Sequence, residues 1–235
     1  MKIGVGLPAS IPGTSVDVIL EWARRADKLG FSSLGIIDRM VYPNYEPLTT
    51  LGAAAAITSR IRLMTTVVVA PARQTVVLAK QAATLDRISS GRLTLGFGVG
   101  GRQDDYEATG ESFKTRGRRF DEQLASVKRM WSGATASERA GPIGPQPVQK
   151  GGPEILIGGY GDSVGPRVAR WGDGFISGGS PPEAAASVFR SVQDAWEKSG
   201  RSGKPRFVCS TYFALGDKAA RPRSSLPARL LRLHG

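Results

Sequence analysis

The sequence is poor in the residues that most often carry catalysis and metal binding. Its 235 residues include one cysteine, Cys209, and one histidine, His234, which is the penultimate residue. Two such residues are too few for a structural zinc site, a disulfide framework or an iron–sulfur cluster. They also leave the body of the chain without a Ser–His–Asp or Cys–His arrangement. We therefore predict no metal site, and an enzyme built on this chain would need a cofactor for its more demanding chemistry.

Long apolar runs are also missing. No run approaches the roughly 18 residues needed to cross a bilayer, and the apolar part of the N-terminal segment MKIGVGLP is too short for a signal peptide. With 40% apolar and 22% charged residues, the composition is that of an ordinary soluble globular protein. We therefore expect a cytoplasmic protein that does not bind membranes.

The net charge of +12 raises the question of nucleic-acid binding. The last 15 residues, RPRSSLPARLLRLHG, supply four arginines and no acidic residue. The remaining Lys and Arg residues are scattered over helical faces, unlike the basic patch of a nucleic-acid-binding protein. We expect no nucleic-acid partner.

Apolar runs alternate with amphipathic segments along most of the chain. β-branched and apolar residues predict strands at 2–7, 33–37, 62–70, 92–97, 154–159, 174–177 and 206–215. Helical spacing of apolar residues predicts helices at 16–29, 48–58, 75–88, 118–131, 164–170 and 182–200, with Ser15 as an N-cap. The Pro- and Gly-rich residues 134–153 are typical of an excursion or small insertion.

Seven strand–helix units of this kind fit either a doubly wound open sheet or a (β/α)8 barrel. The number of units and the chain length favour an α/β fold of the (β/α)8 TIM-barrel type. A closed barrel needs an eighth strand, and the residues after Leu215 do not predict one. We therefore predict a barrel that is truncated before its eighth strand.

Gly96, Gly98 and Gly101 form a literal G-x-G-x-x-G after an apolar strand. A dinucleotide fingerprint should open a helix immediately and be followed about 20 residues later by an acid at the end of the next strand. The polar stretch RQDDYEATGESFKTRG does not predict a helix at once, and Asp121 and Glu122 fall inside the predicted helix 118–131. The motif is instead either a loop that lets a ligand approach the backbone or a plain glycine-rich turn.

Residues 46–110, EPLTTLGAAAAITSRIRLMTTVVVAPARQTVVLAKQAATLDRISSGRLTLGFGVGGRQDDYEATG, resemble the luciferase-like monooxygenases. These are (β/α)8 oxidoreductases that use FMN or the deazaflavin F420. The resemblance continues in RGRRFDEQLASVKRMWSG (116–133) and PEILIGGYGDSVGPRVARWGDGF (153–175), and it covers residues 1 to about 217. The string AKQAATLDRISSGRLTLGFGVG is its most specific part.

The resemblance implies a flavin cavity at the ends of the strands. Leu7 (with Pro8) and Asp38 would line it, and the third strand would end around Val67 to Ala70 in a bulge against the flavin ring, often with a non-proline cis peptide. The implied cofactor-binding residues are Leu7, Asp38, Val69, Ala70, Gly98, Gly100, Gly101, Tyr106, Gly158, Gly159, Tyr160 and Gly161. The last four, GGYG, would present backbone N–H groups and a helix N-terminus to the phosphate, a role that a Gly-rich turn before a helix also suits on physical grounds.

The sequence departs from the family where members often carry histidine. After Asp38 it has Arg39, and after the AP-R of the third strand it has Gln74. Proton transfer would then depend on Asp38, Arg39, Arg73, a tyrosine or water, and the sequence does not rank these candidates. Arg39 could pair with Asp38, hold an anionic substrate or peroxide, or form a surface salt bridge.

A further departure concerns the last residues. We divide the chain into a luciferase-like barrel domain, 1–217, and an atypical basic tail, 218–235. Family members continue past FALGD with a helix, an eighth strand and a final helix, whereas this tail has two prolines, four arginines and no acid. We interpret the tail as the out-of-frame translation of a GC-rich gene, which resequencing would test.

The resemblance implies a monooxygenase that uses reduced FMN and O2 on a small organic substrate, with a separate flavin reductase as a possible partner. An F420-dependent hydride-transfer enzyme and a truncated, non-catalytic paralogue are the alternatives. Family members commonly dimerise through helices of the second to fourth units, so the Ala-rich helix 48–58 is either a homodimer interface or a helix packed closely on the barrel.

Overall fold

Seven strand positions follow one another around a curved parallel sheet in the order in which they occur in the chain. The computed structural model describes residues 1–135, 137, 139 and 141–213. The sheet runs β1 (Val5–Gly6), β2 (Ser33–Ile36), β3 (Arg62–Thr65), β5 (Leu93–Gly98), β6 (Glu154–Gly158), β7 (Gly174–Ser177) and β8 (Arg206–Cys209). A doubly wound sheet reverses its strand order at a switch point. The sequential order therefore excludes a Rossmann fold and confirms the predicted barrel type.

The sheet is open in the part of the chain described here. β1 pairs only with β2, and β8 pairs only with β7, both in parallel. The described residues thus supply seven of the eight strand positions of such a barrel, as predicted. The tail 218–235, and with it the frameshift hypothesis, lies outside the described residues.

The third predicted strand, 62–70, is broken into two pieces. β3 pairs with β2 and β5 and ends at Thr65, and a cis peptide joins Thr66 to Val67. β4 (Val68–Val69) pairs with β5, and one extra residue between Met64 and Val68, relative to β5, makes this break a bulge. Other strands are shorter than expected, since β1 covers two residues of 2–7 and β8 ends at Cys209. β1 and β8 each pair with a single neighbouring strand, so one edge of each has no ladder partner and the regular strand is shorter.

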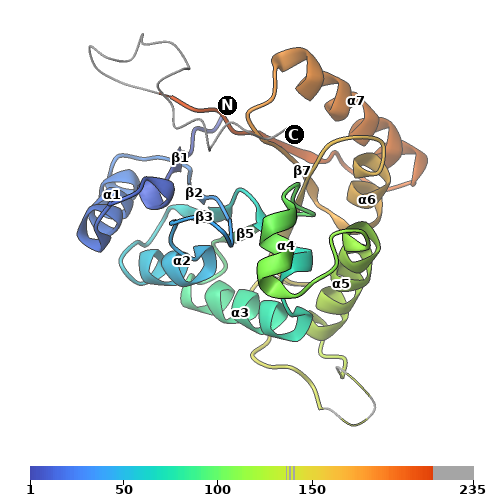
Figure 1. Ribbon diagram of the computed structural model, residues 1–235, viewed down its shortest axis with the longest axis horizontal. Helices are drawn as coiled ribbons and strands as arrows, with labels where there is room; N and C mark the ends of the chain where they lie inside the picture. The colour runs from blue at the N-terminus through green and yellow to red at the C-terminus, as the bar shows by residue number, and fades with distance from the viewer. Residues whose placement is uncertain (136, 138, 140, 214–235) are drawn as a thin grey trace.

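Six helices cover the outer face of the sheet (Figure 1). They are α1 (Val16–Lys28), α2 (Pro47–Ala56), α3 (Thr75–Ile88), α5 (Arg116–Trp131), α6 (Val164–Trp171) and α7 (Pro182–Lys198). The Ser15 side chain caps α1 by accepting the Val18 N–H at 3.4 Å, as predicted. Two short 3-10 turns, η1 (Pro8–Ser10) and η2 (Ala70–Ala72), follow β1 and β4.

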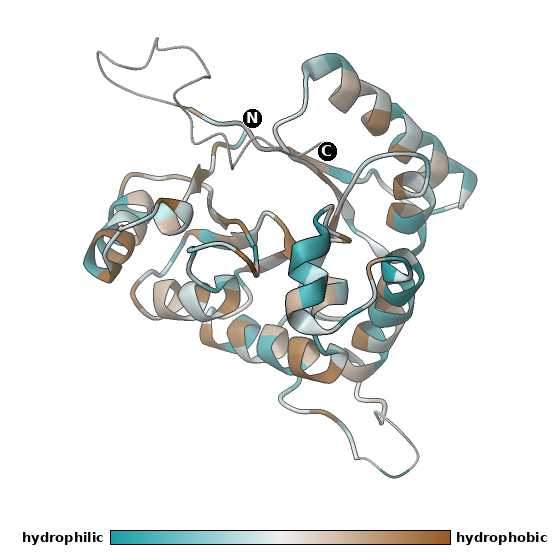
Figure 2. Ribbon diagram, in the orientation of Figure 1, coloured by the Kyte–Doolittle hydropathy of each residue, from teal (hydrophilic) through white to brown (hydrophobic). Residues whose placement is uncertain are grey.

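A seventh helix contradicts one expectation. α4 (Gln103–Thr109) begins two residues after Gly101, in the stretch for which no immediate helix was predicted. Its sequence, QDDYEAT, is polar and too short to show apolar periodicity, although Asp104 and Asp105 stand in its first turn, where acids are favoured. Figure 2 shows it as one of the most hydrophilic elements of the fold.

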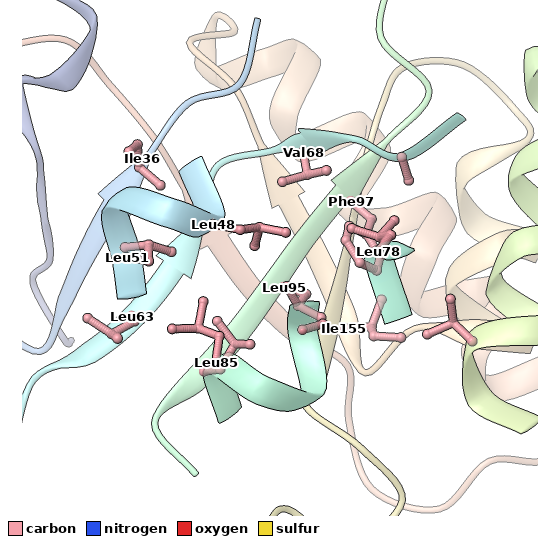
Figure 3. Close-up of a cluster of buried hydrophobic side chains, with 14 of the residues drawn as sticks. Ile36, Leu48, Leu51, Leu63, Val68, Leu78, Leu85, Leu95, Phe97 and Ile155 are labelled. Atoms are coloured by element: carbon pink, nitrogen blue, oxygen red, sulfur yellow. The ribbon is translucent and has the colours of Figure 1, made fainter. Parts of the chain in front are cut away.

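Neighbouring residues of β3, β6 and β7 belong to two different clusters. Side chains on the outer face pack against the helices, among them Leu34, Leu63, Leu95, Phe97 and Ile155, all fully buried (Figure 3). The other face carries a small cluster of Met64, Leu156 and Ile176, with Val67 and Val208 packed against it. Because strand side chains alternate between faces, this second cluster is the interior of the curved sheet.

Asp86 anchors the predicted excursion 134–153 at the end of the sheet where β5 begins. Its fully buried carboxylate accepts N–H bonds from Val148 (2.8 Å) and Gln149 (3.0 Å) and a side-chain bond from Gln149 (2.7 Å). Apart from an isolated bridge between Thr135 and Pro142, the described residues of 134–153 form no helix or strand. Across the described residues, no helix combines the length and the apolar character that a membrane span requires.

Candidate functional site

The predicted site residues gather at the C-terminal ends of the strands. Leu7 follows β1, Asp38 follows β2, Val69 ends β4 and Ala70 begins η2, and Gly98 and Gly158 end β5 and β6. All strands are parallel, so these ends share one edge of the sheet. Leu7 is buried, and its N–H donates to the Gly35 carbonyl at 2.7 Å, which fixes the chain as it leaves β1.

Asp38 lies in a buried ion network at this edge. Its side chain is 1% exposed, and it accepts hydrogen bonds from the Val69 N–H (3.0 Å) and from Arg73 Nη2 (2.9 Å) and Nε (3.3 Å). Arg73 Nη1 also lies 2.9 Å from Glu46 Oε1. Burial raises the pKa of the Asp38 carboxyl, and the Arg73 charge and the Val69 N–H oppose that rise.

Glu46 joins this network to a helix. Its carboxylate accepts the Thr49 N–H at 2.7 Å and so caps α2 while it faces Arg73. Burial acts to raise the pKa of Glu46, but the N–H groups of the first helical turn and the Arg73 charge bring it below its ordinary value. A single arginine, from the turn after β4, therefore bridges two carboxylates at the two ends of the β2–α2 loop.

Arg39 belongs to a second network and does not pair with Asp38. Its Nε donates to Asp105 Oδ2 at 2.8 Å, and its Nη2 lies 3.3 Å from Asp104. Asp105 is buried and also accepts the N–H groups of Met40 and Val41, each at 2.9 Å. Of the three alternatives for Arg39, the structure thus shows a salt bridge, which is partly buried and holds the loop after β2 against α4.

Val67 occupies the space that three glycines leave open. An added Cβ would lie 2.9 Å from a Val67 methyl carbon at Gly98 and also at Gly158, and 3.1 Å from one at Gly96, where it would in addition overlap the Thr65 carbonyl. Two of the three glycines of the G-x-G-x-x-G motif, Gly96 and Gly98, therefore lie within β5 and make room for the β3–β4 break. The cis peptide and the bulge confirm the expected local shape of this segment.

The loop after β5 is supported from below by Tyr106. This side chain is fully buried, packs against Phe113 with ring centroids 5.4 Å apart, and donates its hydroxyl to the Val99 carbonyl. Burial raises the pKa of Tyr106 to about 12. Through this hydrogen bond, Tyr106 holds the loop after β5 in place. Gly101, in the same loop, is open, since a Cβ there would meet nothing within 4 Å.

The segment Gly158–Gly161 leads from β6 towards α6. Gly159 and Gly161 have positive φ angles of 154° and 81°, and a Cβ at Gly161 would meet nothing within 4 Å. Tyr160 is 66% exposed. Ser163, the N-cap of α6, makes no side-chain capping bond. The glycine-rich segment is thus followed by a helix, with Asp162 and Ser163 between Gly161 and the first helical residue, Val164.

Three features of the site were missed from the sequence. Val67 as the partner of the glycines, Glu46 as the second carboxylate on Arg73, and Asp105 as the partner of Arg39 all depend on contacts between distant segments. Two signals were available. Glycines at alternate positions of a strand indicate that another group crosses that face. A proline is favoured at the first position of a helix, so Pro47 marks Glu46 as the N-cap position.

Comparison with known proteins agrees with this geometry. The family model described as luciferase-like monooxygenase matches residues 1–233. An uncharacterised protein of Mycobacterium tuberculosis is 34% identical over 184 residues, which are 75% of this chain and 64% of the relative. The chain therefore spans less than two thirds of that relative's length.

Solved structures share the fold. The monooxygenase RslO1 from Streptomyces bottropensis has a TM-score of 0.80 and 28% identity, over 92% of this chain and 72% of that one. The FMN complex of the oxygenating constituent of 3,6-diketocamphane monooxygenase from Pseudomonas putida has a TM-score of 0.75 and 21% identity, over 92% and 68%. The F420-dependent tetrahydromethanopterin reductase of Methanopyrus kandleri has a TM-score of 0.67 and 21% identity, over 91% and 66%.

The sequential parallel sheet, the broken third strand and the family match over nearly the whole chain lead to one conclusion. This chain belongs to the luciferase-like monooxygenase family.

Proposed function

We propose that the chain is a flavin-dependent monooxygenase that uses reduced FMN and O2 to oxidise a small organic substrate. The observation that carries the proposal is the juxtaposition of two features at one edge of the sheet. Glycine backbone at the ends of β5 and β6 lies beside the β3–β4 bulge, and an open Gly-rich turn precedes α6. The first feature suits a flat ring system and the second suits a phosphate.

The phosphate end of the site fits by its donors. Gly159, Gly161 and Gly165 offer backbone N–H groups to an anion, and α6 offers the positive end of its dipole, whereas the Val164 N–H donates to the Gly161 carbonyl at 3.3 Å and Pro166 has no N–H. A Cβ would meet no atom within 4 Å at Gly161 or at Gly101, so a ligand has room to reach the main chain at both positions. Ser163 keeps its hydroxyl free of a capping bond.

The ring end of the site fits by its shape. In the bulge at Thr66–Val69, the Val69 N–H is bonded to Asp38, and the Val67 side chain packs against the glycines of β5 and β6. Bound reduced FMN would supply the electrons for activation of O2, with a separate flavin reductase as their source. The chain itself would position the ring, hold the phosphate and restrict water.

F420-dependent hydride transfer is the second candidate. Its support is the fold shared with the F420-dependent reductase of Methanopyrus kandleri, together with a site in which Asp38, Arg39 and Arg73 are all held in ion pairs. FMN and F420 both carry a tricyclic ring and a phosphate, so the glycine-rich loops suit either one. A third possibility, a paralogue without catalytic activity, predicts binding without turnover.

Parallel titrations test the proposal. Purified protein is titrated with FMN, riboflavin and F420, and binding is followed by ligand fluorescence. We expect FMN to bind more tightly than riboflavin, because only FMN carries the phosphate. Ser163→Asp places a carboxylate at the N-cap of α6 and should weaken FMN binding while it leaves riboflavin binding unchanged. F420 binding without FMN binding would replace the first candidate by the second.

Turnover separates an enzyme from a binding protein. The FMN-loaded chain is supplied with a flavin reductase, and oxygen consumption is measured with and without a panel of small ketones and aldehydes. We expect substrate-dependent oxygen uptake with product formation. Tight FMN binding without any substrate-dependent uptake would favour the non-catalytic paralogue.

A further inference from the structure

The buried carboxylate of Asp38 has a donor on each of its oxygens. Oδ2 accepts the Val69 N–H (3.0 Å) and Arg73 Nε (3.3 Å), and Oδ1 accepts Arg73 Nη2 (2.9 Å). The side chain is 1% exposed. A group enclosed in this way is poorly placed to exchange a proton with a substrate, but it is well placed to fix the backbone of Val69.

Arg73 extends the same network to two helices. Its guanidinium reaches Glu46, the N-cap of α2, at 2.9 Å. Its carbonyl accepts side-chain bonds from Gln123 (2.9 Å) and Arg119 (3.2 Å) of α5. Arg73 directly follows the turn η2, so its contacts with α2 and α5 hold this turn in place. Of Asp38, Glu46, Arg119 and Gln123, only Asp38 bonds to the bulge itself, among the contacts of the described chain.

Val69 lies two residues after Val67, whose methyl groups fill the space at Gly96, Gly98 and Gly158. A shift at Val69 would move Val67 and change the surface that the glycines and the bulge form together. Val69 also packs at Gly100, where an added Cβ would lie 2.7 Å from one of its methyl carbons. The backbone hydrogen bond to Asp38 thus controls the position of two side chains that contact the glycine-rich segment.

We infer that Asp38 is a positioning residue that fixes the β3–β4 bulge through the Val69 N–H, and that it does not take part in proton transfer. The inference rests on the proposed function for its effect on the cofactor, but the contact with Val69 exists without it. Arg73 serves as the buried counter-charge that keeps the carboxylate in place. Arg39, tied to Asp105, acts on a different loop.

Two substitutions separate geometry from charge. Asp38→Asn keeps an oxygen that can accept the Val69 N–H and removes the negative charge, whereas Asp38→Ala removes both. Asp86→Asn is the matched control, because Asp86 is also a fully buried acid that accepts backbone N–H groups but lies at the opposite end of the strands. The free energy of unfolding of all three variants is measured by denaturant titration, so that a general loss of stability is separated from a local one.

Amide hydrogen exchange measured on peptides that cover residues 66–73 is the first readout. We expect exchange at Val69 to be at least about tenfold faster in Asp38→Ala than in the unmodified chain, because a buried donor loses its acceptor. The increase in Asp38→Asn should be clearly smaller, and Asp86→Asn should not change these peptides. Equal acceleration in the Asn and Ala variants, or none in either, would overturn the inference.

Cofactor binding is the second readout. The dissociation constant and the visible absorption spectrum of bound FMN should change in Asp38→Ala, stay closer to the unmodified protein in Asp38→Asn, and remain unchanged in Asp86→Asn. If both Asp38 variants bind FMN normally, with an unchanged spectrum, but lose turnover and one limb of the pH–rate profile, Asp38 takes part in the chemistry and the inference is wrong. If the unmodified chain binds neither FMN nor F420, the proposed function fails, and the exchange data still decide whether Asp38 fixes the bulge.

Discussion

The packing of Val67 against glycines predicts a specific energetic coupling. Gly98→Ala would place a methyl group 2.9 Å from Val67 Cγ2 and 3.4 Å from the Gly158 carbonyl oxygen. Gly98 does not have a positive φ, so the substitution costs nothing in backbone conformation. A β-branched side chain has few alternative rotamers, so Val67 cannot turn away easily. Any destabilisation should therefore come from this contact.

The size of the effect follows from the geometry. Overpacking of this kind costs about 1–3 kcal/mol. Val67→Ala removes two methyl groups from a partly exposed site, which costs about 1–2 kcal/mol at roughly 0.8 kcal/mol per group with a small cavity term. In the double variant the added methyl group at residue 98 enters the space that Val67 vacates. We expect the double variant to be more stable than the sum of the two changes by about 1–2 kcal/mol.

Denaturant unfolding of the four proteins measures this coupling, provided that the m-values agree. Gly101→Ala is the matched control, because its Cβ would meet nothing within 4 Å and its φ is not positive. It should change stability by less than about 0.5 kcal/mol. Strict additivity of Gly98→Ala and Val67→Ala, within about 0.5 kcal/mol, would refute the argument that the glycines exist to accommodate Val67.

Three further predictions follow from polar contacts. Asp27 accepts the N–H groups of Ser59, Arg60 and Ile61; burial works to raise its pKa, but these bonds hold the pKa below the ordinary 3.8. The Asp27 carboxylate should therefore stabilise the fold above about pH 4, and this contribution should be lost as the pH falls through its lowered pKa. The unfolding midpoints of the unmodified chain and of Asp27→Asn should converge in acid, and a difference that stays constant with pH would contradict this. The Arg92 side chain donates to four main-chain carbonyls, those of Ala55, Thr58, Ile61 and Ser89. In denaturant titrations, Arg92→Ala should lower the free energy of unfolding by about 2–3 kcal/mol. A loss of less than about 0.5 kcal/mol would argue against a role for these bonds in stability. Arg39→Ala should speed proteolysis in the loop after β2, because Asp105 loses its buried partner, and an unchanged cleavage rate would show that the Met40 and Val41 N–H groups suffice.

Local sequence was enough for most of the architecture. The strand–helix alternation reports on alternating burial along the chain, and seven units in succession leave few topologies, so the parallel barrel-type sheet was predictable. A helix N-cap could be predicted where the capping residue directly precedes its helix, as Ser15 precedes α1. The short helix α4 was missed because seven polar residues carry no hydrophobic periodicity.

The candidate site was predictable as a region but not as a set of contacts. Parallel strands must bring their C-terminal ends to one edge, so Asp38, Val69, Gly98 and Gly158 could be grouped from the sequence together with the family resemblance. Asp38 pairs with Arg73, which lies 35 residues later, and not with its neighbour Arg39. A linear sequence contains no information about the direction of these side chains after a strand end.

The sequence by itself determined the alternation of strands and helices, the glycine-rich ends of β5 and β6, and, through its resemblance, membership of the family. Only the tertiary structure decided what the glycines are for, because the side chain that fills their space, Val67, lies between β3 and β4, about 30 residues before the glycines of β5 and about 90 before Gly158 of β6. It also decided which charges pair, because Arg39 meets Asp105 of α4, whereas Arg73, which follows η2, meets Asp38 and Glu46 of the β2–α2 loop. Periodicity and propensity are local properties of a chain, whereas close packing and charge pairing arise only when distant segments meet.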